Sequence, residues 1–192
     1  MLLKEVNNVP ERKKPDEYDM VFESLGIMSP KSMMNYITGS MRKDQESKTI
    51  SLNTTISAGL NKFPANLIDG VTKAHRISTK DKKKDKIIQI INRLTTRLDE
   101  VIENLPPEPR GALKLVIEAG GWVRYNQLSN KYGGEENDSY FWGSEPPTSA
   151  IGILRSHALL FTGKAGIKGR MYKVAVVPIE VRKQLEEGDL IK

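Results

Sequence analysis

The sequence contains no cysteine and only two histidines, His75 and His157. The lack of cysteine excludes disulfide bonds, a thiol nucleophile and thiolate metal sites. The two histidines lie in separate regions, and no carboxylate stands at a metal-ligand spacing from either. We therefore predict no metal site and no cofactor, and we expect His157 to pack or form hydrogen bonds within the fold.

Familiar enzyme motifs are absent as well. The sequence has no Gly-x-Ser-x-Gly nucleophile elbow. The glycine-rich stretch 163–170 continues into a predicted strand, whereas a phosphate-binding P-loop needs Lys, then Ser or Thr, and a following helix. The acidic stretch 135–138 has no second cluster beside it and does not match a calcium loop. We predict that the chain is not an enzyme.

Long apolar runs are also missing. No stretch approaches the roughly 18–20 apolar residues that span a bilayer, and the N-terminus has no signal-peptide pattern. We expect a soluble intracellular protein, cytoplasmic, or associated with the nucleoid or nucleus if it binds DNA. Aromatic residues make up only 6% of the chain, so the expected core is mainly aliphatic.

Positive charge is in excess. The 30 Lys and Arg residues outnumber the 24 Asp and Glu residues and give a net charge of +6. This balance favours a polyanionic partner: DNA, RNA or an acidic protein surface. A basic segment at 73–86 includes Lys82, Lys83 and Lys84. It is either a solvated hinge before the next helix or a stretch that contacts phosphates.

The N-terminal region shows weak helical patterns between turn signals. Residues 1–15 are predicted to be a flexible tail, and residues 16–84 a region of short helices. These helices are expected at 16–25, 30–39, 54–60 and 64–77, with a polar loop over 40–53.

The strongest helical pattern covers residues 85–105. Its apolar residues alternate spacings of four and three, like the a and d positions of a coiled coil. They are Ile87, Ile91, Leu94, Leu98, Val101 and Leu105. Two interpretations stay open: the stripe packs on the chain's own core, or it forms a dimerisation seam with a second copy or a protein partner.

A proline-rich stretch after Leu105 ends this helix, so we place the start of the last domain at residue 106. Over 106–192 the pattern predicts a helix, a short strand, two helices, a strand, a basic turn, a strand and a helix. The expected fold class is mainly α with a small antiparallel β-hairpin. Residues 140–142, three consecutive aromatics in a long loop, are expected to plug the core, with a contact surface as the alternative.

The third helix of this domain has two faces. Ala150, Ile151, Leu154 and Ala158 fall on one face, and a polar face with small residues lies opposite. The residues predicted to face nucleic-acid bases are Thr148, Gly152, Arg155 and Ser156, and Ser149 is also predicted to contact nucleic acid. Ser149 or Thr148 also suits the N-cap, and Arg155 has the chemistry to read guanine.

This order of elements resembles the winged helix-turn-helix superfamily. The resemblance runs from about Pro106 to Glu187, through the helix–strand junction at 151–160 and the hairpin 163–177. It implies a third helix in the major groove and a wing along the backbone. The residues expected to hold phosphates are Lys164, Lys168, Arg170 and Lys173, with no carboxylate between Arg155 and Lys173.

Together these features predict a nucleic-acid-binding protein, with DNA preferred over RNA and a regulatory or chromosome-organising role. The alternative is a non-catalytic subunit that docks to protein or RNA within a larger assembly. The short N-terminal helices and the few aromatic residues favour this alternative.

Overall fold

The computed structural model of the chain describes residues 24–78 and 80–188. The tail predicted at 1–15 and nearly all of the helix predicted at 16–25 lie outside these residues. The chain divides into a first unit that ends at Gly39 and a second unit that begins at Ser40.

Helix α2 (Pro30–Ser47) begins in the first unit. Ser29 caps it, because the Ser29 hydroxyl accepts a hydrogen bond from the backbone N–H of Ser32 at 3.2 Å. The predicted stop at Gly39 is wrong, since the helix continues through residues predicted as loop. The glycine costs about 1 kcal/mol relative to alanine. Hydrogen bonds of Arg42 and Gln45, near the end of α2, offset that cost.

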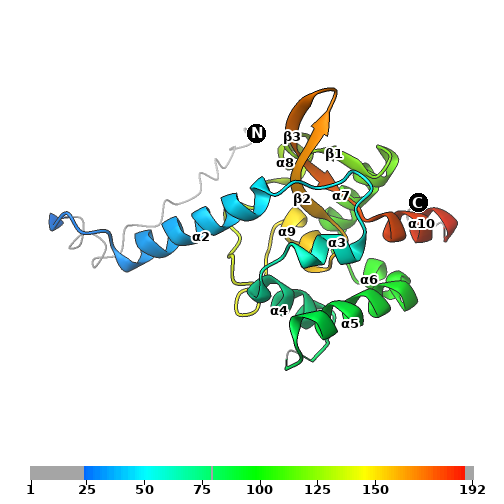
Figure 1. The fold of residues 1–192 in the computed structure, drawn as a ribbon, viewed down its shortest axis with the longest axis horizontal. Coiled ribbons are helices and arrows are strands. Elements are labelled where there is room, and N and C mark those ends of the chain that lie inside the picture. Colours follow the sequence, from blue (N-terminus) through cyan, green and yellow to red (C-terminus); the bar gives the residue numbers. More distant parts are fainter. Residues whose placement is uncertain (1–23, 79, 189–192) are drawn as a thin grey trace, which may run out of the picture. The chain divides into compact units, whose positions relative to one another are not determined.

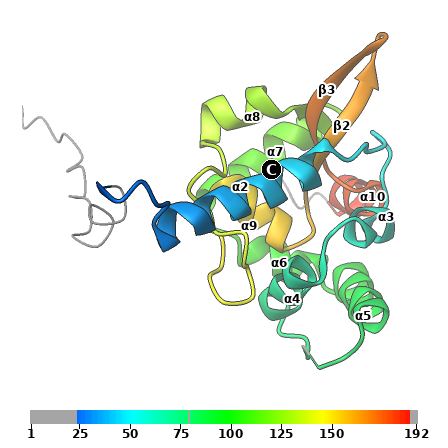
Figure 2. The same ribbon diagram turned by 60° about the vertical axis from the view of Figure 1, so that its left-hand side comes forward.

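The second unit is mainly helical with a small antiparallel sheet (Figures 1 and 2). Its helices are α3 (Ile56–Asn61), α4 (Ala65–Ala74), α5 (Lys83–Thr96), α6 (Leu98–Glu103), α7 (Pro107–Glu118), α8 (Tyr125–Tyr132), α9 (Ala150–Ser156) and α10 (Ile179–Glu187). Its strands are β1 (Trp122–Arg124), β2 (Phe161–Ile167) and β3 (Arg170–Val176), in the order β1-β3-β2. The element order predicted for 106–192 is confirmed.

One hydrophobic core extends from Ile50 to Leu185. Helix α10 joins it by backbone contact, because the N–H of Ile179 donates to the carbonyl of Thr54 at 3.0 Å. The N–H of Ile56 in turn donates to the Glu180 carboxylate at 3.1 Å. The domain boundary predicted at residue 106 is therefore wrong. Prolines end a helix there, but they do not separate two cores.

The helix predicted over 85–105 is two helices, because the chain turns at Arg97 (φ −143°, ψ 38°) between α5 and α6. Its apolar stripe faces the chain's own core, where α3, α4 and α10 pack against α5. Ile91 is half-buried, and the buried members are Ile87, Leu94, Leu98, Val101 and Leu105. The own-core interpretation is confirmed, and the dimerisation seam is wrong because the chain itself covers these residues.

Within the described residues, no helix combines the length and the apolar character that a membrane crossing requires.

Candidate nucleic-acid interface

Helix α9, the predicted base-reading helix, is enclosed by the fold. It packs against α4, α7 and α8. Gly152, Arg155 and Ser156 are buried, and the Ser156 hydroxyl donates to the carbonyl of Ile153 at 2.9 Å. The predicted base-facing surface is therefore wrong for these three residues. Thr148 stays exposed at the end of the preceding loop.

Arg155 belongs to a buried polar network. Its side chain is 2% exposed, and its Nη1 pairs with Glu135 Oε1 at 2.5 Å. Its Nη2 donates to Gln45 Oε1, near the end of α2, at 2.6 Å. The guanidinium carbon also lies 5.3 Å from the Trp142 ring centre and 5.6 Å from that of Phe63. Arg155 was predicted to contact DNA, because the sequence does not show that its acidic partner is Glu135, which lies 20 residues earlier in a loop.

The insertion loop (residues 133–149) covers the start of α9. Asp138 Oδ1 accepts from the backbone N–H groups of Thr148 and Ser149 at 2.8 and 3.0 Å. Asp138 Oδ2 accepts from the Ser149 hydroxyl at 2.5 Å, and that hydroxyl also caps the helix by accepting from Gly152 N–H at 2.9 Å. A Cβ on Gly152 would lie 2.1 Å from Asp138 Oδ2. Ser149 is therefore an N-cap, and Gly152 is required by close packing rather than by DNA.

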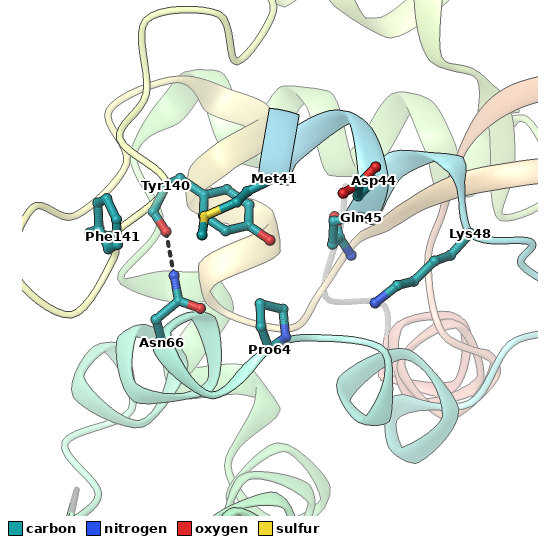
Figure 3. A pocket seen from close by; sticks show the side chains of 8 residues that line it. All are labelled: Met41, Asp44, Gln45, Lys48, Pro64, Asn66, Tyr140 and Phe141. Carbon is teal, nitrogen blue, oxygen red and sulfur yellow. Dashed lines mark hydrogen bonds between the residues drawn. The ribbon is translucent and has the colours of Figure 1, made fainter. Parts of the chain in front are cut away.

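The aromatic residues of the insertion loop plug the core, as predicted. Tyr140 and Trp142 are buried, and Phe141 is half-buried beside a shallow pocket of about 260 Å³ (Figure 3). The Asn66 side-chain amide holds this part of the loop by donating to the Tyr140 carbonyl at 2.9 Å. Arg42 adds hydrogen bonds to the carbonyls of Glu135 and Asp138. The loop thus ties α9 to the end of α2, and this explains why α2 continues past Gly39.

The basic hairpin (residues 161–176) is the exposed part of the predicted interface. In both ribbon views its turn projects beyond the helices of the second unit (Figures 1 and 2). The turn consists of Lys168 (φ 48°) and Gly169 (φ 77°), between the paired residues Ile167 and Arg170. Two positive φ angles are typical of a type I′ turn. Glycine suits such a position, whereas a lysine there is strained.

Three cations of this hairpin are free to bind an anion. Lys164, Lys168 and Arg170 are exposed, and their side chains have no hydrogen-bond or ion-pair partner among the described residues. Lys164 lines a hollow of about 370 Å³ beside β2, together with Lys43 and Lys173 and with the carboxylates of Asp44 and Glu46. The sequence did not reveal Lys43, which lies in the stretch predicted to be a loop.

Two predicted phosphate contacts are used within the fold instead. Lys173 pairs with Glu46 at 2.8 Å and lies 3.4 Å from the Tyr125 ring centre. Lys83 donates to the carbonyls of Asn61 and Phe63, near the end of α3, at 3.1 and 2.7 Å. Burial, followed by repulsion from Lys48, lowers the pKa of Lys83. The predicted roles of Lys173 and Lys83 are wrong in this conformation, whereas Lys82 and Lys84 are exposed.

Arg124 extends the cationic surface. It ends β1 opposite Val174, and its guanidinium carbon lies 4.1 Å from the Tyr172 ring centre on β3. Arg124 was not among the predicted site residues, because only the pairing of β1 with β3 brings it to the hairpin.

A scan against protein-family models, a search of curated proteins and a search of solved structures each find no match for this chain. Among the described residues, no group of three or more His, Asp or Glu side chains could hold a metal ion. The proposed function below therefore rests on the geometry of the site.

Proposed function

We propose that residues 106–188 have the winged-helix arrangement of elements within the second unit and that the protein binds nucleic acid, DNA in preference to RNA, through the basic hairpin. The observation that carries this proposal is the set of unpaired cations Lys164, Lys168 and Arg170 on a projecting hairpin. Exposed cations that form no ion pair can displace the counterions of a polyanion. The order of elements and the β1-β3-β2 sheet support the winged-helix assignment.

The shape of the hairpin favours DNA. A two-stranded β-ribbon fits the wide major groove of B-form DNA, whereas side chains do not reach into the narrow major groove of A-form RNA. Because α9 is enclosed, backbone contacts should dominate over base reading. We therefore propose weak sequence preference and a chromosome-organising or regulatory role without catalysis.

Binding of the full chain to a mixed-sequence DNA duplex and to a matched RNA duplex tests this proposal. We expect tighter DNA binding that weakens steeply between about 50 and 200 mM salt. Failure to bind either duplex at the lower salt concentration would reject the proposal.

Lys168→Asn removes a positive charge from the hairpin turn and should leave the folded structure intact. Asparagine tolerates positive φ better than lysine, so the free energy of unfolding should stay the same or rise slightly. Loss of one phosphate contact should weaken binding on all sequences and reduce the salt slope by about 1. Calorimetric unfolding and fluorescence anisotropy measure the two effects. Unchanged affinity in a stable variant would remove Lys168 from the interface.

Protein docking is a second candidate function, and a separate observation favours it. Of the nine exposed large apolar side chains in the described residues, six lie in the first unit, between residues 25 and 36. They are Leu25, Ile27, Met28, Met33, Met34 and Tyr36. Such a concentration is typical of a surface that a partner covers. If this chain associates with a protein and the affinity does not change with salt concentration, the result would favour protein docking over DNA binding.

A further inference from the structure

Both histidines of the chain line one cavity, which lies away from the basic hairpin. The cavity measures about 450 Å³, and its lining includes His75, Arg76, Arg93, Glu100, Asn104 and His157. Arg93 lies on α5 and Glu100 on α6, whereas the other four residues follow the ends of α4, α6 and α9. The volume falls within the range of about 300–1,000 Å³ that is usual for small-molecule sites.

Hydrogen bonds fix the orientation of both imidazole rings. His75 Nε2 donates to the His157 carbonyl at 3.0 Å, and His157 Nδ1 donates to the Ile153 carbonyl at 2.8 Å. The rings meet edge to face with centres 5.7 Å apart. His75 Nδ1 and His157 Nε2 are left as the nitrogens that a ligand could use.

The cavity favours an anion. Glu100 is the only carboxylate in its lining, and Arg93 and Arg97 hold its two oxygens at 3.0 and 3.3 Å. Arg76 lines the cavity without a side-chain partner among the described residues. Arg93 Nε is a buried donor that has no hydrogen bond there either.

The pKa of His75 is consistent with an excess of positive charge around the cavity. Burial, opposed by the hydrogen bond to the His157 carbonyl and helped by the charges of His157 and Arg93, lowers the pKa of His75 to about 4. No carboxylate contributes to this shift. An anion in the cavity would therefore raise the pKa of His75.

The backbone at Arg76 is also unusual. Arg76 follows α4 with φ 56°, a left-handed conformation that favours glycine. Glycine would fit this turn better, yet the chain places a guanidinium at the cavity. Strained non-glycine residues of this kind concentrate at ligand sites.

We infer that this cavity binds a phosphomonoester, with Arg76 and Arg93 donating to the phosphate oxygens and with His75 Nδ1 and His157 Nε2 donating to them when the imidazoles are protonated. Guanidinium groups match phosphate geometry, and a phosphate anion suits the unpaired charge of Arg76. The source is either a free nucleotide or the terminal phosphate of a nucleic-acid strand.

The test follows the imidazole NMR signals of the full chain during titration with inorganic phosphate at constant ionic strength. Because the chain has only two histidines, both signal sets report on this cavity. We expect saturable shifts of both sets and a rise of about one pH unit in the titration midpoint of His75.

Arg76→Gly is the informative variant, because glycine suits the left-handed backbone and the fold should be preserved. The response should be lost in Arg76→Gly and kept in Lys80→Gln, which removes an exposed cation outside the lining. Unmoved histidine signals in the wild type, or an equal response in Arg76→Gly, would overturn the inference.

Adenosine monophosphate and a 5′-phosphorylated oligonucleotide, each compared with its unphosphorylated form, identify the source of the phosphate. A phosphate-dependent response to either one supports the inference. DNA binding by the hairpin does not enter this readout, so the two proposals can fail separately.

Discussion

Arg155→Ala is expected to destabilise the fold without relaxing any base preference. The substitution leaves the Glu135 carboxylate buried without its cation, and removing one partner of a buried ion pair typically costs about 3–5 kcal/mol of unfolding free energy. It also removes the hydrogen bond to Gln45 that joins α9 to α2. Chemical denaturation measures the loss.

The matched control removes both charges. Arg155→Met combined with Glu135→Gln should lose less stability than Arg155→Ala, because no buried charge is left uncompensated. If Arg155→Ala instead kept wild-type stability and changed the preferred DNA sequence, α9 would be a base-reading helix after all.

Leu94→Ala should also lower the free energy of unfolding, by about 2–5 kcal/mol, because it opens a cavity at a fully buried position. Since Leu94 packs within a single chain, the loss should be the same at every protein concentration. Thermal unfolding over a hundredfold range of concentration measures it.

Ile88→Ala is the control on the same helix, because Ile88 is 48% exposed. It should change stability little. A dimer seam would give a different result: the unfolding temperature would rise with protein concentration, and Leu94→Ala would weaken that dependence.

Local signals predicted the last seven elements of the fold from the sequence. Glycine pairs, proline positions and alternating apolar residues act over a few residues, and they placed the strands, the hairpin and the helices of 107–187. The continuation of α2 past Gly39 was not predictable in this way. It depends on Arg42 and Gln45 contacting residues about 90–110 positions away in the sequence.

The predicted site residues show the same contrast between local signals and contacts that are distant in the sequence. Lys164, Lys168 and Arg170, which were predicted to hold phosphates, are exposed, because a tight hairpin turn leaves its cations in solvent. Arg155 and Lys173 were assigned to DNA because a sequence shows charge but not the distant partner that neutralises it. Their partners, Glu135 and Glu46, come from the insertion loop and from α2.

The hairpin's role in DNA binding is tested most directly by the salt dependence of three proteins. They are the wild type, a hairpin variant with Lys164→Gln, Lys168→Asn and Arg170→Gln, and a control with Lys80, Lys82 and Lys84 each changed to Gln. The hairpin variant should lose about 2.7 from the salt slope, at about 0.9 per phosphate contact. The control removes the same charge from the 73–86 segment and should lose less. A wild-type slope in the hairpin variant would contradict DNA binding through the hairpin.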